Sequence, residues 1–498
     1  MALENNNIPY SYKNNTIKRK RETPSIRQNK HLIIPGNKCP FIDTINRSVL
    51  DFDFEKLCSV SLSHLNVYAC LVCGKYFQGR GQKSLAYTHS VQMGHHLFIN
   101  LHTLKFYCLP DNYEVVDSSL DDIKYVLQPT FSLEQVQALN KNDKLSRAFD
   151  GTLYSPGIVG LNNIKANDYC NVVLQSLSHV PPLRDYFLRP DNYQKINRPA
   201  GDIAFLSVSR FGELLRKLWN PKHFKAHVSP HEMLQAVVLC SKKRFQFTKQ
   251  GDPVEFLSWL LNAFHLALNG TKKRDSSIIY KTFQGSMRVY SRKVPPLDLS
   301  EDEKMILLLT EEYKERREEQ PFLYLAVDLP PPPLFRDEVE GNIIPQVPIH
   351  SILAKFNGMT EKEYKTYKDS TIKRFELTRL PPYLILCFKR FTKNTFYLEK
   401  NPTIVNFPIQ DVEMAEYICS DPAIQDANPD TTYDLIANVV HDSLPGQTTG
   451  TYRVHILHAG SGKWFEMQDL HVTEILPQMI TLSEAYIQIY KLNTNAKP

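Results

Sequence analysis

Two cysteines and two histidines in the N-terminal part of the chain have the types and the spacing of a metal site. Cys70 and Cys73 form a Cys-x-x-Cys pair, and His89 and His95 follow them. Zinc takes four sulfur or nitrogen ligands in a tetrahedron, and a Cys-x-x-Cys turn supplies two of them from one tight loop. We therefore expect these four side chains to bind one structural zinc ion. The alternative is four unrelated buried residues.

A second informative stretch runs from Gly160 to Gln175 and reads GLNNIKANDYCNVVLQ. It resembles the cysteine box of the ubiquitin-specific proteases, and this resemblance puts Asp168 at the position of the nucleophilic cysteine. A thiolate attacks a carbonyl carbon near neutral pH, whereas a carboxylate has no comparable reactivity toward an isopeptide bond. The resemblance thus implies the protease fold with its nucleophile replaced.

The other two positions of the family's catalytic triad are changed as well. The family's histidine box is similar to YDLIANVVHDSLPGQTTGTYRVHI and to KWFEMQDLHV, which follows it. In that register Thr451 replaces the histidine and Gln468 replaces the orienting Asp or Asn. A threonine hydroxyl cannot act as a general base near pH 7. We interpret Asp168, Thr451 and Gln468 as a degenerate triad and expect no catalytic residue: a pseudo-deubiquitinase.

A displaced Cys-His pair is the alternative that would preserve the chemistry. Cys170 lies two residues beyond Asp168, and three histidines lie near Thr451, namely His441, His455 and His458. Two residues turn a side chain by about 200° around a helix, so we expect Cys170 to face the core. Lys165 stands in the box where glycine is usual, and a pair between Lys165 and Asp168 would close the channel for the ubiquitin tail.

Further family boxes follow in order between residues 157 and 492. They resemble a helix beside the cleft and three buried strands, and they read KQGDPVEFLSWLLN, PFLYLAVDLP, LPPYLILCFKRF and LSEAYIQIYKL. The fingers of the family often carry two zinc-binding Cys-x-x-Cys pairs, but this chain has no cysteine between Cys240 and Cys387. We expect fingers without metal, and a helical insertion with solvated charges over residues 301–320.

The N-terminal Cys/His cluster resembles the ubiquitin-binding zinc-finger (UBP-type) domain that precedes many deubiquitinases, in which up to three zinc ions bind. The second site is incomplete here, since its positions hold Cys58, Ser61, Gln78 and Leu85. A third site would lie near Cys39 and Cys108, for which no complete ligand set is found. Whether Cys39, Cys58 and Cys108 contribute to a further metal site stays open.

Composition limits the remaining possibilities. Residues 1–38 hold eight Lys/Arg against two Glu, which equals the formal charge of +6 for all 498 residues, so the rest is near neutral. A broad nucleic-acid surface is therefore not expected. No apolar stretch reaches the eighteen or so residues that span a membrane, so no membrane partner is expected. Nine scattered cysteines favour a reducing compartment.

We predict an α+β fold class, with a small zinc-finger UBP domain followed by a papain-like ubiquitin-specific-protease fold of thumb, palm and fingers. The expected parts are 1-36, a disordered basic tail; 37-140, the zinc finger; 141-156, a linker; and 157-492, the inactive protease-like domain. The cluster Lys18 to Arg21 reads as a nuclear localisation signal, with an ordinary basic tail as the alternative.

This combination of domains resembles the spliceosomal, catalytically inactive homologues within the ubiquitin-specific-protease family. It implies a nuclear, non-catalytic pre-mRNA splicing factor that docks in assembly or maintenance of the tri-snRNP. The implied partners are spliceosomal snRNP proteins, with ubiquitin bound weakly or not at all, and direct RNA contact stays open. The alternatives are a cryptic or active deubiquitinase and a ubiquitin-binding scaffold outside splicing.

Overall fold

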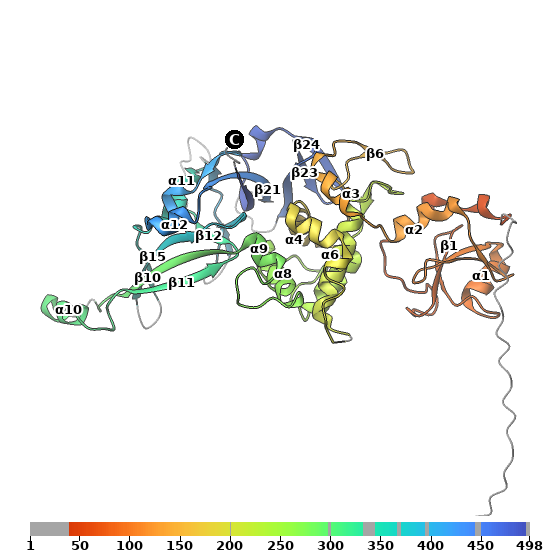
Figure 1. Cartoon of the computed structure of the whole chain (residues 1–498), viewed down its shortest axis with the longest axis horizontal. Coiled ribbons are helices and arrows are strands. Elements are labelled where there is room, and N and C mark those ends of the chain that lie inside the picture. The colour runs from red at the N-terminus through yellow and green to blue at the C-terminus, as the bar shows by residue number, and fades with distance from the viewer. Residues whose placement is uncertain are drawn as a thin grey trace, which may run out of the picture.

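The computed structural model describes residues 39–199, 201–296, 300–331, 344–365, 370–393, 398–443 and 450–494. The predicted disordered tail and the Lys18 to Arg21 cluster lie outside these ranges. Helices and strands are mixed throughout the described residues, which confirms the α+β class. A small domain lies at one end, followed by a helical lobe, a large sheet and a long projecting arm (Figure 1). No helix within the described ranges is long and apolar enough to cross a membrane.

The small domain is built on a five-stranded antiparallel sheet with the order β2-β1-β3-β4-β5. Its strands are short and largely buried because nearly every residue in β1, β3 and β4 is apolar. Their bounds are β1 Val67–Cys70, β2 Tyr76–Gln78, β3 Leu97–Asn100, β4 Phe106–Cys108 and β5 Tyr113–Val115. Helix α1 (Leu85–Met93) connects β2 to β3, and α2 (Asp121–Leu127) follows the sheet.

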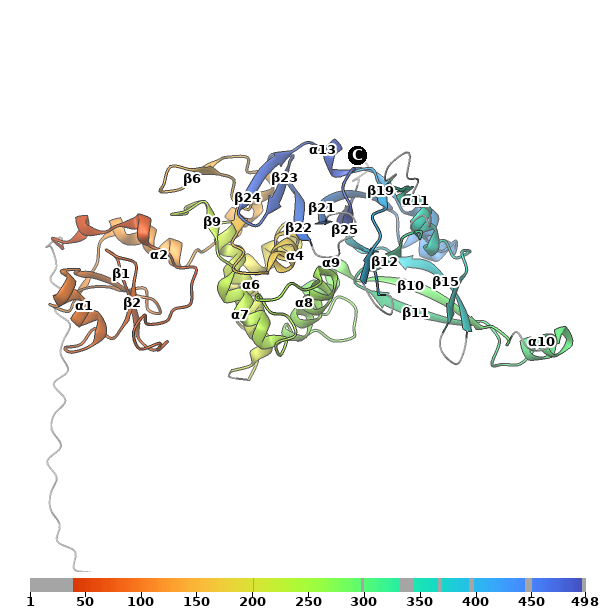
Figure 2. The same cartoon turned by 180° about the vertical axis from the view of Figure 1, so that it is seen from behind.

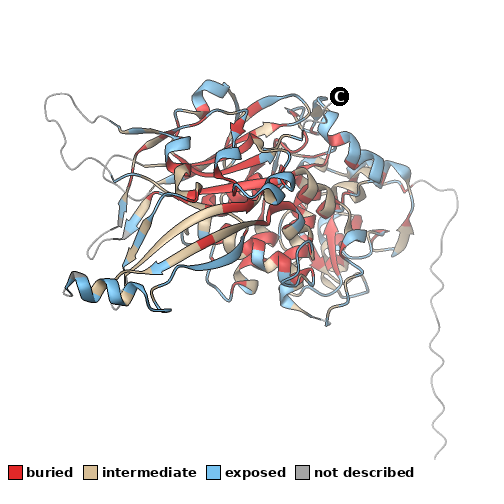
Figure 3. Cartoon of the chain, turned by 60° about the vertical axis from the view of Figure 1, so that its left-hand side comes forward, coloured by how far each residue is buried: buried red, intermediate tan, exposed pale blue. Residues whose placement is uncertain are grey.

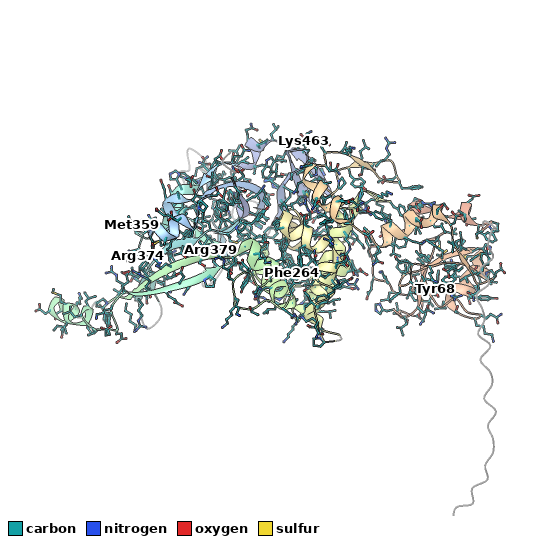
Figure 4. The ribbon with its side chains drawn as sticks, in the orientation of Figure 1. Tyr68, Phe264, Met359, Arg374, Arg379 and Lys463 are labelled. Carbon is teal, nitrogen blue, oxygen red and sulfur yellow. The ribbon has the colours of Figure 1, made fainter. Side chains whose placement is uncertain are left out.

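The helical lobe, the thumb, packs its helices around aromatic side chains. Phe264 on α8 lies 5.4 Å from Phe187 and 4.9 Å from Phe211 between ring centroids (Figure 4 labels Phe264). Helix α8 begins sharply because Asp252 accepts hydrogen bonds from two backbone amides of its first turn. The helices are α4 Asp168–Ser178, α5 Pro181–Leu188, α6 Ile203–Leu218, α7 His231–Cys240, α8 Pro253–Ala267 and α9 Ile278–Phe283.

The palm is one large sheet with the order β12-β16-β25-β21-β22-β23-β24, and β20 (Val412–Glu413) pairs with β21 beside this path. Helix α4 packs against β21 and β22, and a hydrogen bond from the Tyr452 amide to Asp168 joins the start of β22 to the start of α4. The bounds are β12 Leu325–Asp328, β16 Tyr383–Lys389, β21 Thr432–Asp442, β22 Thr451–His458, β23 Lys463–Gln468, β24 His471–Ile475 and β25 Ala485–Leu492.

The fingers form a four-stranded antiparallel sheet with the order β11-β10-β15-β14. The bounds are β10 Gly285–Lys293, β11 Arg316–Phe322, β14 Lys362–Lys365 and β15 Ser370–Arg379. The helical insertion expected over residues 301–320 is wrong in its second half: the helix there, α10, spans only Glu301–Leu308, and β11 begins at Arg316. Pairing with β10 outweighs helix propensity there, because it sets Glu319 opposite Arg288 along an extended edge.

The smaller elements fill the connections between these units. They are α3 Leu133–Ala138, α11 Ile349–Leu353, α12 Pro422–Asp426 and α13 Pro477–Ile480, and the strands β6 Ser146–Arg147, β7 Leu153–Tyr154, β8 Gly160–Leu161, β9 His227–Val228, β13 Gln346–Pro348, β17 Phe391–Lys393, β18 Leu398–Lys400 and β19 Ile404–Asn406. Val136 and Leu139 precede the stretch expected as a linker, and Ala148 and Tyr154 lie within it. All four belong to the core of the large domain. The predicted domain limits remain predictions.

Residues 50–55 (LDFDFE) of the small domain contact the thumb through alternating acidic side chains, and we call this segment the acidic strap. A carboxylate oxygen of Asp53 lies 2.9 Å from Lys217 Nζ on α6, and its other oxygen accepts the Ser229 amide at 2.9 Å. Further polar contacts are Asp51–Lys225 at 2.6 Å and Glu55–Gln235 at 3.0 Å. Phe224 of the thumb also packs into the small domain's core. The two domains therefore share a specific interface.

Replacing Asp53 should weaken this interface in a pH-dependent way. Burial alone would raise the pKa of Asp53, but Lys217 and the Ser229 amide outweigh it and hold the pKa below its usual value. The stabilisation is thus present above about pH 4 and lost as the pH falls below that. We expect Asp53→Ala to lower the free energy of unfolding by about 2–3 kcal/mol at pH 7 and by less at pH 3, measured by urea unfolding. The exposed Asp43→Ala is the control; equal midpoints for both variants at pH 7 would contradict the role of the strap.

Candidate functional site

Asp168 is the first residue of α4 and lies at the junction of the thumb and the palm. Its side chain is only 4% exposed. A carboxylate in the first turn of a helix interacts favourably with the helix dipole, which helps to explain how a charged group is accommodated there. The sequence-predicted nucleophile position is therefore a buried carboxyl group at a helix N-terminus.

The Asp168 carboxylate connects three separate segments of the chain. Its Oδ2 atom accepts hydrogen bonds from Gln250 Nε2 at 2.8 Å and from the Tyr452 amide at 3.1 Å. Gln250 Nε2 also donates to the Gly450 carbonyl at 2.8 Å. We call these four residues the carboxylate clasp. It joins the start of α4, the loop before α8 and the start of β22.

Gly450 has a steric role in the clasp. A Cβ atom at this position would lie 2.0 Å from the Asp442 carbonyl oxygen at the end of β21. Only glycine lets the start of β22 approach the end of β21 at that distance, and two residues on, the Tyr452 amide reaches Asp168.

Burial raises the pKa of Asp168, and the hydrogen bonds from Tyr452 and Gln250 only partly offset this effect. The second carboxylate oxygen, Oδ1, is buried without a hydrogen-bond partner among the described residues. The protonated carboxyl group is thus favoured relative to an exposed aspartate. Neither protonation state supplies a nucleophile of thiolate strength.

Thr451 and Gln468, which were predicted from separate family boxes, lie beside one another. Gln468 Nε2 donates a hydrogen bond to Thr451 Oγ1 at 3.2 Å, from the end of β23 to the start of β22. An amide and an aliphatic hydroxyl cannot exchange a proton with a substrate near pH 7. The structure therefore brings the predicted positions together without a general base among them.

Sequence reasoning did not assign roles to the polar residues that support this site. Asp469 accepts hydrogen bonds from Asn163 and Asn171, each at 2.9 Å, and so ties the β23–β24 turn to the cysteine box. The signal was present in the sequence, because Asn163, Asn171 and Gln250 match family boxes. Their contacts, however, join positions that lie far apart in the chain.

Cys170 is buried in the thumb core, which confirms the expected direction of its side chain. Burial raises the pKa of its thiol. The nearby histidines are engaged elsewhere: His455 contacts Asn438 and Glu466, and His458 contacts Ser461. His441 packs against Tyr452, and burial lowers its pKa to about 4. No hydrogen bond joins Cys170 to a histidine in the described part of the chain.

The expected pair between Lys165 and Asp168 does not form in the described residues. Lys165 is exposed, and Asp168 is bonded to Gln250 and Tyr452 instead. The physical reason is burial: a lysine ammonium would have to lose its hydration to reach the carboxylate, whereas the two amide donors are already inside. The segments are joined by neutral hydrogen-bond donors and not by an ion pair.

The four predicted metal ligands are gathered in the small domain. Cys70 ends β1, Cys73 follows it, His89 lies on α1, and His95 follows the helix; their ligand atoms all lie within 4.8 Å of one another. His89 Nε2 is 3.1 Å from His95 Nδ1, Cys73 Sγ is 3.4 Å from His89 Nε2, and Cys70 Sγ is 3.6 Å from His95 Nδ1. A zinc tetrahedron has edges of about 3.3 Å between two nitrogens and about 3.6 Å between nitrogen and sulfur. The residues fit that ion.

The other residues that were considered as metal ligands do not form a second cluster among the described residues. They make hydrogen bonds to neighbouring protein groups instead. Cys58 Sγ accepts the amides of Ser61 and Gln78, and the Ser61 hydroxyl donates to Gln78 Oε1 at 2.8 Å. The Tyr113 hydroxyl donates to Cys39 Sγ at 3.3 Å. His96, next to His95, is turned away and bonds the Leu109 carbonyl. At Cys58 and Cys39, hydrogen bonds from protein groups take the place of the metal that a second or third site would bind.

Two families match this chain. One is described as ubiquitin carboxyl-terminal hydrolase and matches residues 159–490, and the other is described as Zn-finger in ubiquitin-hydrolases and other protein and matches residues 58–120. The chain belongs to the ubiquitin carboxyl-terminal hydrolase family. This confirms the family resemblance and the expected arrangement of a zinc finger before a protease fold.

Relatives within the hydrolase family are similar over most of their length. A human protein named ubiquitin carboxyl-terminal hydrolase 39 is 68% identical over 457 residues, covering 92% of this chain and 80% of that protein. A Schizosaccharomyces pombe protein named probable mRNA-splicing protein ubp10 is 45% identical over 478 residues, covering 94% and 89%. A structure described as that of an essential yeast splicing factor matches with a TM-score of 0.70 and 30% identity, over 91% of this chain and 99% of that one.

The carboxylate clasp predicts different outcomes for two substitutions of Asp168. Asp168→Ala leaves the buried Tyr452 amide without its acceptor and should lower the free energy of unfolding by about 1–3 kcal/mol. Asp168→Asn keeps an acceptor oxygen and removes the buried charge. Because burial raises the folded-state pKa of Asp168, the wild type loses stability as the pH rises above about 4, and Asp168→Asn should avoid that loss.

Thermal unfolding of the wild type and both variants between pH 4 and pH 7 measures this difference. We expect Asp168→Asn to gain stability relative to the wild type as the pH rises, and Asp168→Ala to be the least stable throughout. Identical melting curves for all three proteins would show that Asp168 has no structural role.

Proposed function

We propose that this hydrolase-family chain is a non-catalytic pre-mRNA splicing factor that acts as a docking protein in assembly or maintenance of the tri-snRNP. The observation that carries the proposal is the carboxylate clasp: the nucleophile position holds Asp168, bonded to Gln250 and Tyr452. Two relatives that span most of the chain are described as splicing proteins. A protein of this kind acts through what it binds.

The chemistry of the site supports the absence of catalysis. Acyl transfer at an isopeptide bond needs a nucleophile, a base within hydrogen-bond reach of it, and a group that orients the base. Asp168, Thr451 and Gln468 supply none of these functions. Cys170, the one cysteine in α4, points into the core and has no histidine partner among the described residues.

The same site supports weak or absent ubiquitin binding. Gln250 bonds Asp168 of the cysteine box and Gly450 of the histidine box with one amide nitrogen, and so connects the two segments between which the family threads the ubiquitin tail. The fingers carry no cysteine, so no zinc supports the surface that would hold the globular part of ubiquitin. We therefore assign the protein spliceosomal snRNP proteins as partners and the nucleus as its location; direct contact with RNA is not required.

We further propose one structural zinc ion, held by Cys70, Cys73, His89 and His95. The ion would cross-link β1, α1 and the segment that leads into β3. It would also stabilise the folded state of a domain that has only a small hydrophobic core. Gly74 completes the cysteine turn at a positive φ of 73°, and a Cβ atom there would lie 2.4 Å from the Val49 carbonyl oxygen. The zinc finger in turn presents the acidic strap to the thumb.

Purified protein should not hydrolyse ubiquitin-linked reporters and should not react with ubiquitin-based thiol probes. Asp168→Cys alone should not restore turnover either, because the base and the orienting group remain absent and triad members act as a unit. The measurement is reporter hydrolysis, with the single variant and the triple variant Asp168→Cys/Thr451→His/Gln468→Asp beside the wild type. Steady turnover by the wild type that disappears in Cys170→Ala would refute a dead site.

Affinity purification of the full chain from nuclear extract tests the splicing role. We expect snRNP proteins to be recovered in stoichiometric amounts, and ubiquitin conjugates to stay at the level of a mock purification. Enrichment of ubiquitin conjugates without snRNP proteins would instead support a ubiquitin-binding scaffold outside splicing.

Neighbouring histidines provide a matched test of the metal site. His95→Ala removes a proposed ligand, whereas His96→Ala removes a histidine that bonds the Leu109 carbonyl. We expect elemental analysis to find one zinc per chain in the wild type and in His96→Ala, and less in His95→Ala. The zinc finger should then unfold before the large domain, as it should after chelation. A full zinc content in His95→Ala would exclude this ligand set.

A further inference from the structure

Helix α10 carries a group of exposed apolar side chains at the far end of the fingers. It projects beyond the rest of the described chain in opposite views (Figures 1 and 2) and is exposed or partly exposed along its length (Figure 3). The exposed fractions are 68% for Met305, 65% for Ile306, 45% for Leu308 and 79% for Leu309. Large apolar groups that lie together on a surface mark an interaction site more often than isolated ones do.

The apolar residues of α10 are not explained by burial in a hydrophobic core. It spans eight residues, Glu301–Leu308, and none of its described residues is buried. Isolated helices of that length are marginal in water, and packing of an apolar face normally supplies their stability. A capping box between Ser300 and Glu303 fixes its start. The sequence thus specifies a helix none of whose apolar side chains is buried among the described residues.

The base of this helix is held to the arm by ion pairs. Glu312 pairs with Lys293 at the end of β10, and Glu315 pairs with Arg374 on β15. Arg374 lies on the fingers, the arm that carries α10 (Figure 4). These pairs lie just after the helix, so they limit the directions in which its apolar side chains point. Such pre-organisation lowers the entropy cost of docking.

Charge selects the kind of partner. Residues 301–312 contain five acidic residues and one basic residue, a net charge of −4 in a chain whose total is +6. That charge repels nucleic acid, an anionic membrane surface and a second copy of the same tip. It is complementary to a protein groove with basic residues at its rim, the arrangement in which an amphipathic helix docks.

We propose that α10 docks into an apolar groove, edged with Lys and Arg, on a protein of the splicing particle. The inference rests on the proposed function and names the surface that performs it. Met305, Ile306 and Leu309 enter the groove, and Asp302 at the start of the helix pairs with its rim. The former substrate-binding fingers serve here as an arm that carries a docking helix.

Equilibrium binding of the labelled full chain to purified tri-snRNP tests the proposal. The variant Ile306→Ser/Leu309→Ser removes apolar surface at the tip, and the control Leu239→Ser/Leu266→Ser removes exposed leucines from the thumb. Neither pair touches the zinc cluster or the clasp, so both variants should melt like the wild type. We expect the tip variant to bind at least about ten-fold more weakly and the control to bind within two-fold of the wild type.

A charge reversal, Asp302→Lys, should weaken binding at low salt and have less effect at high salt. A photo-reactive residue at position 309 should cross-link to a protein of the particle; cross-linking to RNA or to a second copy of the chain would overturn the proposal, and so would unchanged affinity of the tip variant. If the wild-type chain does not bind the particle at all, the proposed function itself fails.

Discussion

The structure of this protein depends on one buried carboxylate. Asp168 accepts a side-chain hydrogen bond from Gln250 and a backbone hydrogen bond from Tyr452, and Gln250 bonds onward to Gly450. A cysteine thiolate at the same position would be a weaker acceptor for two donors. Under the proposal that Asp168 occupies the nucleophile position, the same side chain that cannot act as a nucleophile supplies a contact that joins thumb and palm.

The remainder of the molecule uses the protease fold as a rigid support. The acidic strap joins the zinc finger to the thumb through Asp53 and Lys217. At the opposite end, the fingers hold together through strand pairing, and Arg288 on β10 also donates a hydrogen bond to Cys419 Sγ at 3.1 Å. The chain thus presents two ends of fixed geometry on either side of the clasp, an arrangement suited to holding other proteins in place.

The sequence predicted the α+β class, the family and the positions that the site brings together, because Asp168, Thr451 and Gln468 each sit inside a recognisable box. The cluster of Cys70, Cys73, His89 and His95 was found from ligand spacing alone. The bond from Gln250 to Asp168 was not predicted, since residues 82 positions apart meet only through the packing of α8 on α4. Residues 316–320 were expected to be helical because a run of charged residues suits an exposed helix. They form a strand because they pair with β10, and that pairing cannot be seen in the local sequence.

The central claim is that the carboxylate clasp has converted a ubiquitin-binding cleft into a closed joint and left the domain to act by docking. Titration of isolated ubiquitin into the full-length protein, followed by NMR shifts of labelled ubiquitin, tests it most directly. The account predicts no saturation at hundreds of micromolar, since the loss of a few contacts of about 1–2 kcal/mol each turns micromolar binding into millimolar binding. A micromolar complex, with the ubiquitin tail seated between the cysteine and histidine boxes, would contradict it.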